Sequence, residues 1–548
     1  MGSELGNTPD TKPVARLDGV GIFWITFATA WTVALVSAMA FLYIKRSTPI
    51  LRIRGLPLSF GAVFFLHMYW VGVTTGYVYG PLMPEVAEFW IMGLWLPFGI
   101  ALFHASNSRF LYVANAQKKY ARRTTEPYRI FTRRPGRISL RESVKVWWNQ
   151  LDYTNKSLSL VATGMVLHFF LTVFMFLISR KFHDSFGIDG TEVTGTPMEQ
   201  KVAQGRGWEW WPSIFWQIFW AWIVAPMILW RARKTHDTQG WRVQTIGCCL
   251  SSLHAAPMWL IAIYVPGMAP VNNYFIPPQW IAVSIMFLEI FTIFLPCWEV
   301  HKQRNLNQET LESIARWESR QRIGGNGAKS LHSQISGSTW GSLMSKAASV
   351  STSSGGSILT MDALEHTLEK NPEPLQEFSA LKDFSGENIA FLMRVRDWRL
   401  AHFGLIAKHK ESSDDEKSST GKTMTRECFE GALHIYLDFI SATCAEFQIN
   451  LSSQDFRKLE SVFEEAAKLV IGGESQYDPA TPFDDVPRAT ADNAAAVVRY
   501  TGDMPVGFDE HVFEEAELSI KYLVLTNTWP KYIKQRRSFD ASSTADTV

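Results

Sequence analysis

Seven long apolar segments occupy most of the chain before residue 300, and they restrict the possible folds more than any other feature. The hydrocarbon core of a bilayer is about 30 Å thick, so a helix needs roughly 20 apolar residues to cross it. We therefore predict an integral membrane protein with a seven-helix bundle. The predicted spans are Val20–Ile44, Leu56–Tyr79, Phe89–Tyr112, Leu158–Ser179, Trp211–Trp230, Val243–Val265 and Ile276–Trp298.

Basic residues are concentrated in every second connection between these segments. The first, third and fifth connections are rich in Lys and Arg, and the third holds ten of them between Lys118 and Lys145. The connections Pro81–Glu88 and His183–Glu209 carry more acids than bases. Short loops rich in Lys and Arg stay on the cytoplasmic side. We expect the N-terminus to lie outside and the chain after Trp298 to be cytosolic, with the plasma membrane as the location.

A few polar side chains fall at membrane depth, where they are candidates for a functional site. They could form a ligand pocket or a proton-sensitive switch. They could instead form hydrogen bonds between neighbouring helices, the role we favour for each histidine, whereas both readings stay open for the glutamate. The residues are His67, His104, His168, His254 and Glu289.

Composition changes after the last span and divides the rest of the chain. A charged helical stretch is followed by a Gly/Ser-rich linker, then by a region of helical periodicity with two polar insertions, and finally by a polar tail. The predicted fold class is thus all-α, a seven-helix bundle followed by a cytosolic helical domain. In chain order the segments are 1–19 (extracellular), 20–298 (bundle), 299–323 (juxtamembrane helix), 324–357 (linker), 358–537 (helical domain, insertions near 409–425 and 472–508) and 538–548 (tail).

Three motifs occur in order within the helical domain. The first heads a long helix that we expect Ser385 to cap, with Glu387 in its first turn. The second is a turn before a helix predicted over Ser453–Ile471. The third is a closing helix that runs into an aromatic terminus. The motifs are Glu387-Asn388, Ile449-Asn450-Leu451-Ser452, and Phe508-Asp-Glu followed by Glu515-Ala516, Ile520, Leu523 and Trp529-Pro-Lys531-Tyr-Ile533.

This series resembles a regulator of G-protein signalling (RGS) domain over about a third of the chain, roughly residues 358–537. The whole arrangement resembles the fungal seven-transmembrane RGS proteins of the receptor-like kind, and plants have a similar arrangement. The membrane half is similar to receptors in span count and topology only, because span three does not end in an Asp/Glu-Arg-Tyr motif and span seven lacks Asn-Pro-x-x-Tyr.

The resemblance implies a GTPase-activating protein for a Gα subunit, with no active site, cofactor or metal of its own. Asn450 would reach toward the catalytic glutamine of Gα and the attacking water, while Leu523 would pack against the first switch. The family usually has Asp at the position of Asn527 and Arg at that of Lys531, so one charge-assisted hydrogen bond is lost. The implied Gα contacts are Glu387, Asn388, Asn450, Leu523, Asn527 and Lys531.

Other functions stay open beside this one. The domain could be an RGS-like scaffold that binds Gα without accelerating hydrolysis, or the chain could be a transporter or orphan receptor with a Gα-docking tail. The ligand, if the bundle has one, is unknown, and so is whether the bundle controls the tail. A net charge of +1 argues against nucleic-acid binding. An intrinsic enzyme is the least favoured reading because no phosphate-binding loop, nucleophile elbow or metal-ligand spacing occurs.

Overall fold

The computed structural model describes residues 12–122, 153–183, 185–233, 235–323, 359–409, 426–471 and 507–545, and single positions at 5, 7, 148, 504 and 505. Within these ranges the regular elements are helices, and an isolated bridge joins Ser179 to Ile188. The all-α prediction is confirmed for this part of the chain. Some predictions fall outside it: the basic residues at 123–147, the linker 324–357, and most of the insertions, at 410–425 and 472–503.

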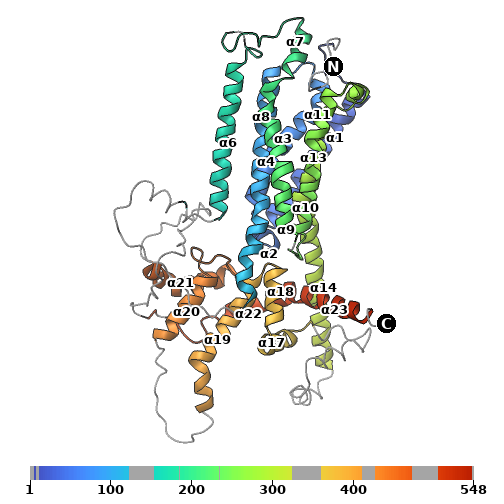
Figure 1. Ribbon diagram of the computed structural model, residues 1–548. Coiled ribbons are helices and arrows are strands. Elements are labelled where there is room, and N and C mark those ends of the chain that lie inside the picture. The colour runs from blue at the N-terminus through green and yellow to red at the C-terminus, as the bar shows by residue number, and fades with distance from the viewer. Residues whose placement is uncertain are drawn as a thin grey trace, which may run out of the picture. The chain divides into compact units, whose positions relative to one another are not determined.

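The chain forms two compact units (Figure 1). Unit 1 comprises Met1–Val113 and Tyr153–His301, and unit 2 comprises Ala114–Asp152 and Lys302–Val548. The segment after residue 113 therefore belongs to the same unit as the C-terminal helices, although the sequence assigned it to a loop of the bundle.

Seven helical segments are long and apolar enough to cross a membrane, and most of their length lies in unit 1. Their number confirms the prediction within the described residues. The third extends to Ala121 and the seventh to Glu312, beyond the predicted ends. The main helices are α1 (Gly19–Ile44), α3 (Leu56–Tyr79), α4 (Glu85–Ala116), α6 (Tyr153–Ile178), α8 (Trp211–Ile218), α9 (Ala225–Ala232), α10 (Trp241–Ser252), α11 (Ala255–Tyr264), α13 (Gln279–Glu289) and α14 (Leu295–Ile323).

Prolines mark the places where these helices change geometry. A π-helical turn, η3 (Phe219–Val224), joins α8 to α9, and Pro226 is the second residue of α9. A second one, η5 (Ile290–Phe294), joins α13 to α14, and Pro296 is the second residue of α14. Proline has no N–H and its ring clashes with the preceding turn, so the regular hydrogen-bond ladder cannot pass through it.

Two helices of unit 1 present apolar side chains to their surroundings. On α1, Ile22, Phe23 and Val33 are exposed, and on α6, Leu167 and Phe170 are exposed. Lipid tails solvate such side chains as well as a protein interior does. This exposure is what a lipid-facing helix requires, and it would be costly on a helix facing water.

Unit 2 is a helical domain around an aromatic core. Phe463 lies in the middle, with Phe429 at 5.7 Å, Tyr436 at 5.3 Å and Phe513 at 5.6 Å between ring centroids. The predicted helix Ser453–Ile471 is confirmed as α21. The elements are η1 (Gln117–Ala121), the end of α14, α17 (Met361–Lys370), α18 (Glu373–Leu381), α19 (Gly386–His409), α20 (Arg426–Phe439), α21, α22 (Glu514–Leu523), η7 (Val524–Thr528) and α23 (Trp529–Ala545).

Candidate functional site

A buried hydrogen-bond network inside unit 1 joins two of the predicted intramembrane residues. Glu289, the last residue of α13, is fully buried and lies 2.9 Å from His67 Nδ1 on α3. Trp31 Nε1 on α1 donates to the other carboxyl oxygen at 2.6 Å. The network therefore links three of the seven span helices, as polar groups at membrane depth commonly do.

The network continues beyond the carboxyl group. The Thr32 hydroxyl donates to the Ala28 carbonyl at 2.7 Å, and its oxygen lies 3.0 Å from His67 Nε2. Both oxygens of the Glu289 carboxyl group have a hydrogen-bonding partner, which makes its burial tolerable.

We expect Glu289→Leu to lower the free energy of unfolding of unit 1 by about 1–3 kcal/mol, because it leaves the Trp31 N–H and His67 Nδ1 without a partner. Thermal unfolding in detergent micelles, compared with wild type, measures the change. Glu289→Gln is the matched control, since its carbonyl can accept from Trp31 and its amide can donate to His67. Equal losses in both variants would mean that the ionisable pair itself, and not only its hydrogen bonds, is required.

His168 has a structural task that its sequence position did not reveal. Pro97 lies within α4 and cannot donate to the Gly93 carbonyl one turn earlier. His168 Nε2, from α6, lies 2.7 Å from that carbonyl oxygen and satisfies it. The side chain thus compensates for a proline inside a neighbouring helix, and it lies apart from the His67–Glu289 network.

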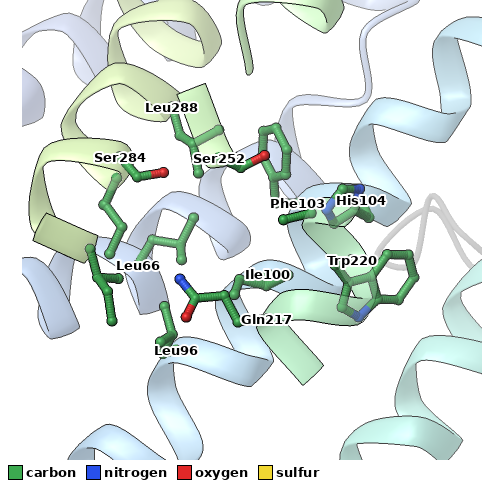
Figure 2. Close-up of a pocket in the computed structure, with 13 residues that line it drawn as sticks. Leu66, Leu96, Ile100, Phe103, His104, Gln217, Trp220, Ser252, Ser284 and Leu288 are labelled. Atoms are coloured by element: carbon green, nitrogen blue, oxygen red, sulfur yellow. The ribbon is translucent and has the colours of Figure 1, made fainter. Parts of the chain in front are cut away.

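His104 borders a small cavity in unit 1 (Figure 2). Its ring stacks on Trp220 at 4.5 Å between centroids, and its Nδ1 is buried without a hydrogen-bond partner among the described residues. The cavity has a volume of about 30 Å³, and the Trp220 N–H, Gln217, Ser252 and Ser284 provide its other polar groups. This volume accommodates a water molecule, whereas organic ligands occupy several hundred Å³. His254 does not line the cavity. Among the five predicted intramembrane residues, the structure brings His67 and Glu289 into direct contact.

In unit 2, a buried aspartate connects two of the predicted Gα-binding stretches. Asp383 precedes α19 and accepts hydrogen bonds from Lys531 Nζ and Thr528 Oγ1, both at 2.8 Å, and from Ser385 Oγ at 3.0 Å. The start of α19 is therefore tied to η7 and α23. We use "candidate docking face" for the four predicted residues on these stretches: Glu387, Asn388, Asn527 and Lys531.

The other two predicted contacts are placed by the core of unit 2. Buried Ile449 donates its N–H to the Phe439 carbonyl at 2.9 Å, which fixes the turn that carries half-buried Asn450. Phe439 in turn packs against Phe391 of α19, with ring centroids 6.0 Å apart. Leu523 ends α22 and is half-buried directly before η7, the turn that contains Asn527.

A segment that the sequence assigned to a loop covers the start of α19. The Gly386 N–H donates to Gln117 Oε1 at 3.0 Å, and Gln117 Nε2 donates to Glu387 Oε2 at 2.9 Å. The expected N-cap, Ser385, instead directs its hydroxyl to Asp383. Gln117 thus satisfies the first N–H of the helix from a distant part of the chain, a role that no local signal could reveal.

The neighbours of Gln117 make this contact extensive. Tyr120 is buried, its carbonyl accepts from Gln376 Nε2 at 2.9 Å, and its ring lies 6.3 Å from that of Phe439. Lys119 forms an ion pair with Glu446. Burial raises the pKa of the nearby Asp438 to about 6, because its effect outweighs the opposing attraction of the carboxylate to Arg394 and Lys119.

A second contact on the candidate docking face comes from α14. Gln303 Nε2 donates to Asn527 Oδ1 at 2.7 Å. Three of the six residues expected to contact Gα are almost inaccessible, with 8% of Glu387, 6% of Asn388 and 5% of Asn527 exposed. Comparison with known proteins gives no relative: no protein-family model, no curated protein and no solved structure matches this chain.

Proposed function

We propose that this protein is a membrane-tethered regulator of heterotrimeric G-protein signalling, whose unit 2 accelerates GTP hydrolysis on a Gα subunit. The observation that best supports the proposal is the Asp383 cluster. It brings the Glu387-Asn388 motif together with the Asn527–Lys531 stretch, although about 140 residues separate them in sequence. The proposal places unit 2 in the cytosol and the N-terminus outside, in accordance with the distribution of Lys and Arg.

The proposed mechanism requires no catalytic group from this chain. A Gα subunit carries its own arginine for the transition-state charge and a glutamine that orients the attacking water. Glu387 and Asn388 would hold the switch backbone, and Asn450 would steady the glutamine. Fixing mobile groups in the reactive arrangement lowers the barrier without new chemistry.

Attachment to the membrane would increase the effect. A Gα subunit is anchored to the same surface, so confinement raises the concentration at which the two proteins meet without adding a contact. A modest intrinsic affinity is then sufficient, which is relevant here because Asn527 replaces the acid that the family usually has.

We expect Asn450→Ala to reduce the acceleration of GTP hydrolysis by about tenfold to a hundredfold, the effect of losing one transition-state hydrogen bond of about 1.5–3 kcal/mol. The measurement is single-turnover hydrolysis by purified Gα subunits mixed with the full chain in lipid nanodiscs. Asn371→Ala, at an exposed position at the end of α17, is the matched control. Failure of the full chain and of all its variants to bind any Gα would refute the proposal.

The second candidate is a scaffold that binds Gα without accelerating hydrolysis. Asn527 supports it, because its neutral carboxamide replaces a carboxylate and already pairs with Gln303. Binding to Gα loaded with GDP and aluminium fluoride, without any acceleration by wild type or variants, would favour the scaffold over the activator.

A further inference from the structure

The candidate docking face is covered by the chain's own residues. We propose that η1 and Gln303 are autoinhibitory contacts, which close this face and must withdraw before a Gα subunit can bind. The contacts themselves are independent of function, whereas their inhibitory consequence rests on the function proposed above.

Gln117 occupies the polar groups with which a partner would have to bond. Its carbonyl takes the first free N–H of α19, and its amide takes one oxygen of the Glu387 carboxylate. Gln117 is fully buried, so neither bond competes with water. A Gα switch can reach Glu387 only after both bonds break.

Tyr120 packs as a core residue would. Its ring is buried against Phe439 and Phe447. Gly386 allows the approach, since a Cβ at this position would lie 2.8 Å from Tyr120 Cβ and 2.7 Å from Ala380 Cβ. The close fit at a glycine indicates a specific docked state of η1 and not a chance surface contact.

The side chain of Asn388 is better suited to an open state of the candidate docking face than to the closed state. Its side-chain oxygen is buried and has no hydrogen-bond partner among the described residues. Buried unpaired acceptors are rare and costly. Once η1 has withdrawn, a donor from a bound partner would satisfy this oxygen. Gα binding and closure use the same residues and therefore exclude one another.

Connectivity suggests what controls closure. η1 follows α4 directly, and Gln303 lies within α14, so both contacts belong to helices that continue from membrane-type spans. The apparent affinity for Gα falls in proportion to the fraction of open molecules. Any rearrangement that shifts the ends of α4 or α14 would therefore change the activity of unit 2.

Closure can be measured without a hydrolysis assay. A carbodiimide joins a lysine to a carboxylate only when the two are in contact, and Lys119 and Glu446 form such a pair. In the full chain in nanodiscs we expect a 119–446 amide cross-link, detected by mass spectrometry, that decreases when Gα with GDP and aluminium fluoride is added. Absence of this cross-link from the free protein would overturn the proposal, whatever the hydrolysis rates are.

The inhibitory effect is measured by single-turnover hydrolysis at limiting amounts of the full chain. We expect Gln117→Ala to raise the acceleration about tenfold, by removing two buried hydrogen bonds that exist only in the closed state. Gln303→Ala should raise it several-fold without altering the start of α19. Exposed Gln308→Ala, on the same helix as Gln303, should have no effect.

The outcomes separate this proposal from the function on which it rests. Acceleration by wild type that neither Gln117→Ala nor Gln303→Ala increases would overturn autoinhibition and leave the GTPase-activating function standing. No acceleration by any variant, with the cross-link present, would refute both the function and its inhibition. Loss of the gain when Asn450→Ala is added to Gln117→Ala would show that the released activity depends on the predicted Gα contact of Asn450.

Discussion

Replacing Lys531 by methionine is expected to lower the stability of unit 2 by about 3–5 kcal/mol, the cost of leaving a buried charge without its partner. The Lys531 ammonium is 2.8 Å from a carboxylate oxygen of Asp383, whose side chain is completely buried. Thr528 and Ser385 also donate to Asp383, but neither carries a charge. We therefore expect the lysine to stabilise unit 2, whatever contact it makes with Gα.

Hydrogen exchange over α18, α19 and α23 is the suitable measurement, because it reports the opening free energy of unit 2 separately from the membrane unit. Lys534→Met is the control, since Lys534 is exposed three residues further along α23. Lys531→Arg should retain most of the stability because its guanidinium can also pair with the carboxylate. A Lys531→Met change within about 0.5 kcal/mol of wild type would contradict a role for Lys531 in holding Asp383.

The second large effect is expected in the aromatic core. Phe463→Ala should destabilise unit 2 by about 3–5 kcal/mol, since it removes a ring that packs against Phe429, Tyr436 and Phe513 and leaves a cavity among them. Exchange protection of α20, α21 and α22 should fall together, because the three helices share this ring.

Leu469→Ala on the same helix is the matched control. Leu469 is 69% exposed, so its removal should change stability by no more than about 0.5 kcal/mol. If Phe463→Ala affected α21 alone, α20 and α22 would not form one cooperative core with it.

Features that depend only on residues close together in the sequence could be predicted from the sequence. Segment length and apolarity predicted the seven helices that are suited to a membrane, and periodicity predicted the helix Ser453–Ile471. Both signals arise from the helical repeat acting on consecutive residues, so no knowledge of the fold is needed to detect them. The end of the third span was less predictable, because α4 continues as a helix after the apolar pattern stops.

The candidate sites were predicted as residue types but not as partners. Glu289 and His67 were both singled out, yet their contact joins positions 222 residues apart. His168 was considered for a polar site, whereas its task depends on Pro97 in another helix. A histidine that satisfies a carbonyl and one that binds a ligand look alike in a sequence, because they differ only in the group that the folded chain places next to the imidazole ring.

The sequence by itself determined the all-helical class, the seven membrane-type segments and the position of Glu387-Asn388 at the head of a helix. Only the tertiary structure decided that Gln117 and Gln303 cover Glu387 and Asn527. The physical reason is the separation in sequence between the interacting residues. Helix formation depends on hydrogen bonds four residues apart, whereas the closing contacts depend on the complementarity of surfaces that meet only after the chain has folded.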